Sequence, residues 1–239
     1  MGRIDDLVAL VCGGDSHPLA PALRGWAEDS RPWLAFAEAH AAKIRKKARL
    51  AASEDELHDL IAELAVAALL VRDRRFWAVY EPLRASGGRA PDLGVTFRTH
   101  FPFHVEVTRL RPSGAAEDRT ALRLARVVGD KVEQLPPGAA NLLAVALPPG
   151  AAGDDLIPEA LRLLSRSAGQ AASPGVRPED ARAYARGRGR LSAALLCALT
   201  PAGRPVEVRL WLNPQARHPL HPEVARYLAG PPGRSPQAQ

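Results

Sequence analysis

The chain has 239 residues, of which 46% are hydrophobic and 24% charged, and its formal net charge at pH 7 is +6. This composition is typical of a globular protein and excludes a disordered or fibrous chain. The longest apolar runs, 64–71 and 192–199, are shorter than the roughly 20 residues of a membrane span, and the first residues lack a signal-peptide pattern. We therefore expect a cytoplasmic protein without membrane contact, in which Cys12 and Cys197 are buried thiols.

The first half of the chain predicts helices followed by strands. Residues 1–73 show helical periodicity, with Ser30 and Ser53 as N-caps and a capping-box pattern from Ser53 to Glu56. The period then changes, and the aromatic and β-branched runs 75–82, 92–99 and 103–110 predict three successive strands. A helix over 117–135 and an apolar strand over 141–148 follow, which predicts a helical crossover within one sheet.

The second half predicts a helix, a long loop and a hairpin. The helix covers about 154–168, and the loop covers 167–190 with one helical turn around 181–184. Strands over 192–199 and 205–212 form a hairpin around "TPAGRP", and a final capped helix lies within 211–228. The predicted class is α/β, a mixed central sheet with flanking helices. Residues 1–52 form an N-terminal helical extension, 53–228 the α/β domain and 229–239 a disordered tail.

Two acidic residues, Asp92 and Glu106, stand on the second and third predicted strands. If the turn between these strands centres near His100, position 92 faces 108 and position 94 faces 106, so that Asp92, Glu106 and Thr108 share one face. The two acids are then diagonal neighbours, about 7 to 8 Å apart at the backbone. Their carboxylates can converge on one divalent cation, which offsets their mutual repulsion.

The "PD" at 91–92, thirteen intervening residues and "EVT" at 106–108 resemble the motif of the PD-(D/E)xK nuclease superfamily. The resemblance covers about 95 residues, 54–148, in which the predicted order is helix, three strands, helix, strand. It implies a restriction-endonuclease-like αβββαβ core and Mg²⁺-dependent hydrolysis of DNA phosphodiesters. By this resemblance Asp92 and Glu106 bind Mg²⁺ or Mn²⁺, and Glu63 is the candidate third acid, with Glu56 as the alternative.

One position departs from the superfamily pattern, because Thr108 stands where the motif has a lysine. A threonine hydroxyl can hold a water but brings no positive charge, and losing one preorganised group commonly costs about 3 to 4 kcal/mol of transition-state stabilisation. Lys131, the only lysine after position 47, is the candidate replacement. Arg123 and Arg126 compete for this role, because a helix antiparallel to the third strand places them level with Glu106.

Two basic stretches, 43–49 and 182–190, are candidates for nucleic-acid binding. Within them we predict backbone contacts by five residues and stacking of Tyr184 on a base, although solvated surfaces explain both stretches equally well. The five residues are Lys43, Lys46, Lys47, Arg186 and Arg188. Two functions follow: a metal-dependent DNA nuclease, weakened or inactive because of Thr108, or an inactive nuclease-fold module that binds nucleic acid or a protein partner. The sequence leaves homodimer formation open.

Overall fold

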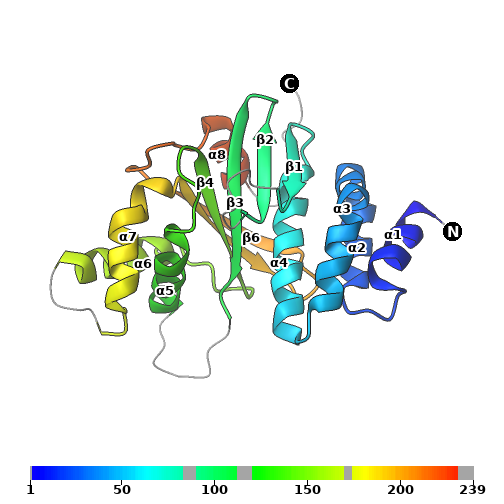
Figure 1. Cartoon of the computed structure of the whole chain (residues 1–239), viewed down its shortest axis with the longest axis horizontal. Helices are drawn as coiled ribbons and strands as arrows, with labels where there is room; N and C mark the ends of the chain where they lie inside the picture. Colours follow the sequence, from blue (N-terminus) through cyan, green and yellow to red (C-terminus); the bar gives the residue numbers. More distant parts are fainter. Residues whose placement is uncertain (1, 83–89, 112–119, 170–173, 231–239) are drawn as a thin grey trace.

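The computed structural model describes residues 2–82, 90–111, 120–169 and 174–230. Within these ranges the chain is mixed α/β, with eight α-helices around one open sheet of six strands (Figure 1). The helices are α1 (Arg3–Cys12), α2 (Ala20–Asp29), α3 (Arg31–Leu50), α4 (Glu54–Val71), α5 (Thr120–Val132), α6 (Leu156–Gly169), α7 (Pro178–Gly187) and α8 (Pro222–Ala229). The strands are β1 (Phe76–Tyr80), β2 (Leu93–Phe97), β3 (Phe101–Arg109), β4 (Ala140–Leu147), β5 (Ala193–Leu199) and β6 (Pro205–Leu212). A short 3₁₀ helix, η1 (Arg188–Arg190), precedes β5.

The strands lie in the sheet in their chain order, β1 to β6. The pairs β1–β2, β2–β3 and β5–β6 are antiparallel, whereas β3–β4 and β4–β5 are parallel. The predicted meander, the crossover through α5 and the hairpin near the C-terminus are therefore confirmed. The predicted extent of α5 is tested only from residue 120, and the predicted tail lies mostly outside the described residues.

The sheet separates two hydrophobic layers (Figure 1). Helices α1–α4 and α8 pack on one face, and α5–α7 pack on the other. Side chains of β4 show the division, because Leu142 belongs to the first layer and Leu143 to the second, as the alternation of side chains along a strand requires. Leu7 of α1 and Trp33 of α3 lie in the same cluster as Leu142, so the N-terminal helices share the core of the α/β domain.

Side-chain caps fix the starts of the two helices that were predicted most firmly. Ser30 Oγ accepts a hydrogen bond from the Trp33 N–H at 3.3 Å, and Ser53 Oγ accepts one from the Glu56 N–H at 3.2 Å. The Glu56 carboxylate in turn accepts from the backbone N–H of Ala52 at 2.7 Å. These bonds satisfy backbone donors that a helix N-terminus leaves without partners.

Helix α7 takes up residues 178–187 of the loop predicted over 167–190, so the helical turn predicted around 181–184 is part of a longer helix. Pro178 begins the helix, and Asp180 in its first turn forms two hydrogen bonds with the Arg177 guanidinium, at 2.8 and 2.6 Å. These are ordinary helix-start signals, which the Gly- and Arg-rich flanks of the segment obscured. Tyr184 is buried beneath the helix, so it does not provide the base-stacking surface predicted for it.

Gly129 allows α5 and α7 to approach each other closely. A Cβ at this position would lie 2.4 Å from the Cβ of Asp180, well inside van der Waals contact. We expect Gly129→Ala to lower the free energy of unfolding by about 1 to 3 kcal/mol, the usual cost of overpacking, as measured by urea denaturation. Gly153→Ala, where an added Cβ meets nothing within 4 Å, is the matched control, and equal stability of the two variants would contradict the prediction.

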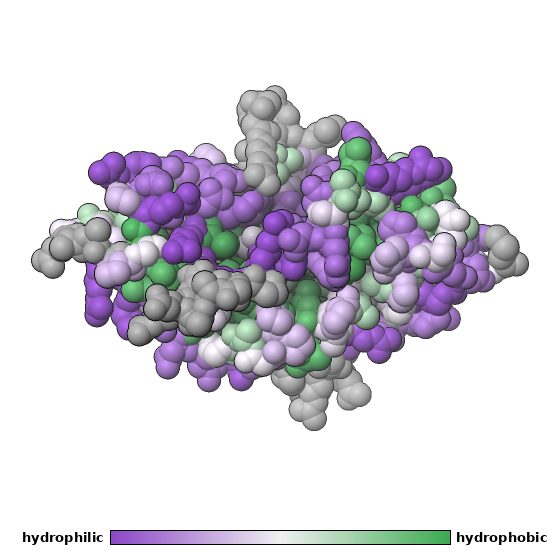
Figure 2. Space-filling model, turned by 90° about the horizontal axis from the view of Figure 1, so that it is seen from below, coloured by the Kyte–Doolittle hydropathy of each residue, from purple (hydrophilic) through white to green (hydrophobic). Residues whose placement is uncertain are grey.

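The face of the molecule seen from below is mostly polar. Seen from below, hydrophilic residues dominate, and hydrophobic residues show in narrower areas between them (Figure 2). No described helix combines the length and the apolar character that crossing a bilayer requires. Both cysteines are free thiols; Cys197 is buried as predicted, while Cys12 is only partly buried.

Candidate functional site

The β2–β3 hairpin places Asp92 opposite Glu106. Leu93 pairs with Val105, and extending this register by one pair brings the two acids face to face. The predicted diagonal arrangement was wrong because the turn centres one residue earlier than His100. Arg98 and Thr99 both adopt positive φ angles, 48° and 67°, and two consecutive left-handed residues close a tight hairpin turn.

Asp92 directly precedes β2, at the point where the pairing of β2 with β3 ends and β3 continues. Beyond Val105, β3 pairs with β4 on one side only. On its other side the Val107 N–H donates to Asp92 Oδ2 at 2.7 Å. The carboxylate thus takes the place of a strand carbonyl and holds Asp92 beside Glu106.

Lys131 of α5 contacts Glu106 directly. Its Nζ lies 2.8 Å from Glu106 Oε1, and the two side chains are only 14% and 7% exposed. The geometric expectation favoured Arg123 or Arg126, which lie nearer the start of the helix. Long helical side chains point back toward the helix N-terminus. The Lys131 side chain therefore contacts Glu106 although the Lys131 backbone lies farther along α5 than the position level with Glu106.

A second set of charges approaches Asp92 from the opposite layer. Glu63 of α4 accepts a hydrogen bond from Lys47 Nζ at 2.7 Å and a short one from the Tyr80 hydroxyl. Lys47 Nζ also lies 3.0 Å from Glu81 Oε1. Burial acts to lower the pKa of Lys47, but Glu63 and Glu81 outweigh it and raise that pKa, so the ammonium stays charged.

Lys43 fixes the backbone at the end of β1. Its ammonium donates to the carbonyl oxygens of Tyr80 and Glu81, both at 2.7 Å. Glu81 has a φ of 44°, a left-handed conformation that a residue with a side chain seldom adopts. The lysine therefore stabilises a strained connection that leads out of β1 toward the acids.

Asp92 is the carboxyl whose ionisation the surroundings disfavour most clearly. Burial, followed by the nearby charges of Glu63 and Glu106, raises the pKa of Asp92 to about 7, although the Val107 N–H and Lys47 act in the opposite direction. Strong perturbation by burial and specific charged neighbours is typical of functional sites. The three acids therefore act electrostatically as one cluster, which we call the acid cluster: Glu63, Asp92 and Glu106.

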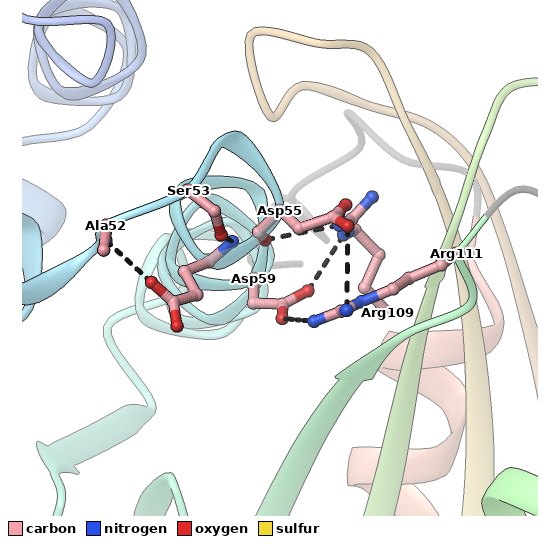
Figure 3. A network of polar contacts seen from close by, with 7 residues as sticks. Ala52, Ser53, Asp55, Asp59, Arg109 and Arg111 are labelled. Atoms are coloured by element: carbon pink, nitrogen blue, oxygen red, sulfur yellow. Dashed lines mark hydrogen bonds and ion pairs between the residues drawn. The ribbon is translucent and has the colours of Figure 1, made fainter.

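An arginine network ties the helix that carries Glu63 to the strand that carries Glu106 (Figure 3). Arg109 Nε donates to Asp59 Oδ1 at 2.9 Å, and Arg111 Nη2 donates to Asp59 Oδ2 at 2.8 Å. Arg109 also bonds to the side chain of Asp55. These contacts join the first two turns of α4 to the end of β3, so they help to hold the acid cluster together.

The residues predicted to bind nucleic acid occupy three different settings. Lys43 and Lys47 belong to the surroundings of the acid cluster, as described above, while Lys46 is exposed on the neighbouring surface of α3. Arg186 is exposed and forms an ion pair with Glu133 at 2.7 Å. Arg188 is exposed in η1. The structure brings Glu63, Asp92, Glu106 and Lys131 together. Thr108 lies two residues beyond Glu106 on β3, and the two arginines lie on α7 and η1.

The described residues contain no group of three or more His, Cys, Asp and Glu side chains arranged to hold a metal ion. Two carboxylates suffice for Mg²⁺, because this ion keeps several waters and commonly takes one or two protein carboxylates together with substrate phosphates. Asp92 and Glu106 supply hard oxygen donors, and the raised pKa of Asp92 shows charge that the protein compensates only in part. The donor set therefore fits a hydrated divalent cation.

Tyr80 and Glu81 were not singled out from the sequence. Tyr80 is fully buried, and burial together with the Glu63 charge raises its pKa, so its hydroxyl stays protonated and donates to Glu63. The available signal was the polar end of the run "RFWAVYEP".

A pocket of about 350 Å³ between α2, α3 and α4, lined by Trp26 and Trp33 among others, contains no member of the acid cluster.

No family model matches this chain, and comparisons with curated proteins and with solved structures also give no match.

Proposed function

We propose that this protein is a divalent-metal-dependent nuclease that hydrolyses DNA phosphodiesters. The observation that carries the proposal is the position of Lys131, whose ammonium lies 2.8 Å from Glu106 while Glu106 stands opposite Asp92. A PD-(D/E)xK site needs two acids and one positively charged side chain beside them. Here Lys131 of α5 would supply the positive charge that Thr108 lacks.

The element order supports the same proposal. Helix α4, strands β1 to β3, helix α5 and strand β4 follow one another along the chain and share one sheet. This is the αβββαβ order of the restriction-endonuclease-like core, and the acids stand at the start of its second strand and within its third. We infer that residues 54–147 form such a core, with α1–α3 packed against it.

Each residue of the site then has a role. Asp92 and Glu106 would hold Mg²⁺ or Mn²⁺, which supplies Lewis acidity toward a phosphodiester and a water. Lys131 would orient the water and offset negative charge on the scissile phosphate. Glu63, which accepts hydrogen bonds from Lys47 and Tyr80, would help to attract a cation to the cluster. Thr108, on the same face of β3 as Glu106, would hold a water through its hydroxyl.

Cleavage assays with plasmid and single-stranded DNA test the proposal. We expect cleavage with Mg²⁺ or Mn²⁺ and none with EDTA. We also expect Glu106→Gln to lower the rate by at least about 100-fold, because it removes a proposed ligand of the metal ion, which supplies several kcal/mol of transition-state stabilisation. Glu207→Gln, on β6 at the far edge of the sheet, is the matched control. Cleavage that persists in EDTA, or that Glu106→Gln leaves unchanged, would contradict the proposal.

The same ion pairs also favour a second function, an inactive module that binds nucleic acid. Lys131 and Lys47 already offset the charges of Glu106 and Glu63, so these two acids do not need a metal for charge compensation. If wild type binds DNA without cleaving it under any metal condition, this second function replaces the first.

A further inference from the structure

One face of the β1–β3 meander is covered by helices, whereas on the other face most side chains of the described strand residues are at least partly exposed, and Pro82 lies against Gly94 there. Toward α1–α4, most residues of these strands are buried, from Phe76 and Tyr80 to Val105 and Val107. Phe101 is exposed and Arg109 is half-buried at the two ends of β3. The residues that point the other way are exposed or half-buried, except Glu106, which is buried. In Figure 1 the upper parts of β2 and β3 extend beyond α5 and α7. We call this surface the open face; its residues are Trp77, Val79, Gly94, Thr96, Pro102 and His104.

The open face leads directly to the acid cluster. Trp77 pairs with Thr96, which pairs with Pro102, and the next row on this face is Val79, Gly94 and His104. The row after that contains Asp92 and Glu106. Strand spacings of about 4.8 Å and rises of about 3.3 Å per residue place the Cα of Trp77 about 16 Å from that of Glu106. A few nucleotides of an extended strand cover this distance.

Trp77 is the feature of the open face that indicates a ligand. Its indole is 74% exposed, on an edge strand where water contact with so large an apolar side chain is unfavourable. Arg74 beside it is exposed, and among the described residues it has no ion-pair partner. Both residues also line a pocket of about 230 Å³ at this edge of the sheet, together with Phe36 and Ala78 of the helix-covered side. An exposed ring next to a cation suits a nucleobase with its phosphate.

We propose that the open face binds an unpaired strand of nucleic acid and that Trp77 stacks on a base a few nucleotides from the scissile phosphate. The position of that phosphate rests on the proposed function. Stacking on a side chain requires a base that is free of its partner and of one neighbour. The substrate class is therefore single-stranded DNA, or duplex DNA with a single-stranded end, rather than intact duplex.

Binding measured without metal tests this proposal independently of cleavage. Fluorescence anisotropy with a labelled oligothymidylate in EDTA gives the dissociation constants of wild type, Trp77→Ala and Trp77→Phe. We expect Trp77→Ala to weaken binding by about 5- to 150-fold, the range for one base stacked on an aromatic ring, and Trp77→Phe to weaken it less. Leu212→Ala, at an exposed position of β6, is the matched control, and binding to blunt duplex should not respond to Trp77→Ala.

The outcomes separate this inference from the proposed function. If wild type cleaves DNA and Trp77→Ala binds oligothymidylate like wild type, the open face is not the strand-binding surface, while the nuclease assignment stands. If Trp77→Ala weakens binding and wild type never cleaves, the surface stands and the nuclease assignment fails. If sedimentation shows a wild-type dimer that Trp77→Ala dissociates without a change in DNA binding, the face belongs to a second copy and the inference is overturned.

Discussion

Replacing Lys131 by methionine will lower the rate of metal-dependent DNA cleavage by about 100- to 1,000-fold, and adding Thr108→Lys to that variant will recover at least about tenfold of the loss. The first effect follows from removing the ammonium that lies 2.8 Å from Glu106. The second follows from the strand geometry, because position 108 is two residues along β3 from Glu106 and on its face.

The same substitution in the wild-type background behaves differently. With Lys131 present, the site already has its cation, so Thr108→Lys alone will not raise the rate. A second ammonium there competes for the same carboxylate. A gain from Thr108→Lys in wild type would mean that Lys131 does not supply the catalytic charge.

Stability must be followed together with the rate. Lys131 and Glu106 form a buried pair, and removing one partner of such a pair is destabilising by about 3 to 5 kcal/mol. Single-turnover rates should therefore be measured well below the melting temperature of each variant. Arg166→Met, a substitution at an exposed position of α6, is the matched control for loss of a positive side chain.

Lys131→Arg distinguishes two roles of the lysine. Arginine keeps the charge but does not give up its proton at accessible pH. If Lys131 only offsets phosphate charge, the arginine variant keeps much of its rate and its pH profile. If Lys131 takes a proton from the attacking water, the variant loses activity as completely as Lys131→Met. A variant with wild-type activity and profile would exclude proton transfer by Lys131.

How much of this site the sequence predicts depends on the kind of information that each residue carries. Asp92 and Glu106 stand out because they interrupt apolar alternation, and strand alternation is a local property of the chain. Ser30 and Ser53 are equally local, since a helix cap involves residues three apart. The two caps and the order of the elements from α4 to β4 were predicted correctly, while the role of the two acids stays a prediction.

The contacts between elements were harder to predict because they depend on geometry that no local pattern contains. The hairpin register is set by positive φ angles at Arg98 and Thr99, residues that rarely adopt them, so the sequence shows no glycine there to mark the turn. The contact of Lys131 with Glu106 depends on how far α5 runs past β3. The bond from Lys47 to Glu63 depends on how α3 packs beside α4.

The acid cluster also makes the stability of the protein depend on pH and metal through Asp92. Its folded-state pKa of about 7 is raised above the ordinary value of 3.8, so the folded state binds a proton more tightly than the unfolded state does. The Asp92 charge therefore does not destabilise the folded state below pH 4. Its destabilising effect on the free energy of unfolding grows as the pH rises from about 4 to about 7 and is constant above that. The rise corresponds to an upper bound of roughly 4 kcal/mol.

Asp92→Asn removes that cost, because an amide has no charge to desolvate and still accepts a hydrogen bond from Val107. Without metal we expect Asp92→Asn to be more stable than wild type at pH 8, by about 1 kcal/mol or more within this bound, and to lose the advantage near pH 4. Urea denaturation at several pH values measures the difference. Asp154→Asn, at an aspartate with an 81% exposed side chain, is the matched control.

Mg²⁺ should act in the opposite direction and stabilise wild type relative to Asp92→Asn. Binding to the folded state stabilises it by RT ln(1 + [Mg²⁺]/Kd), about 1.4 kcal/mol at a tenfold excess over Kd, and only wild type has both ligands. The gain should shrink below pH 7, since a proton on Asp92 competes with the cation and weakens apparent affinity about tenfold per pH unit. Equal stabilisation of wild type and Asp92→Asn by Mg²⁺ would place the cation elsewhere. If metal-free Asp92→Asn is less stable than metal-free wild type at pH 8, the Asp92 charge is already compensated within the protein.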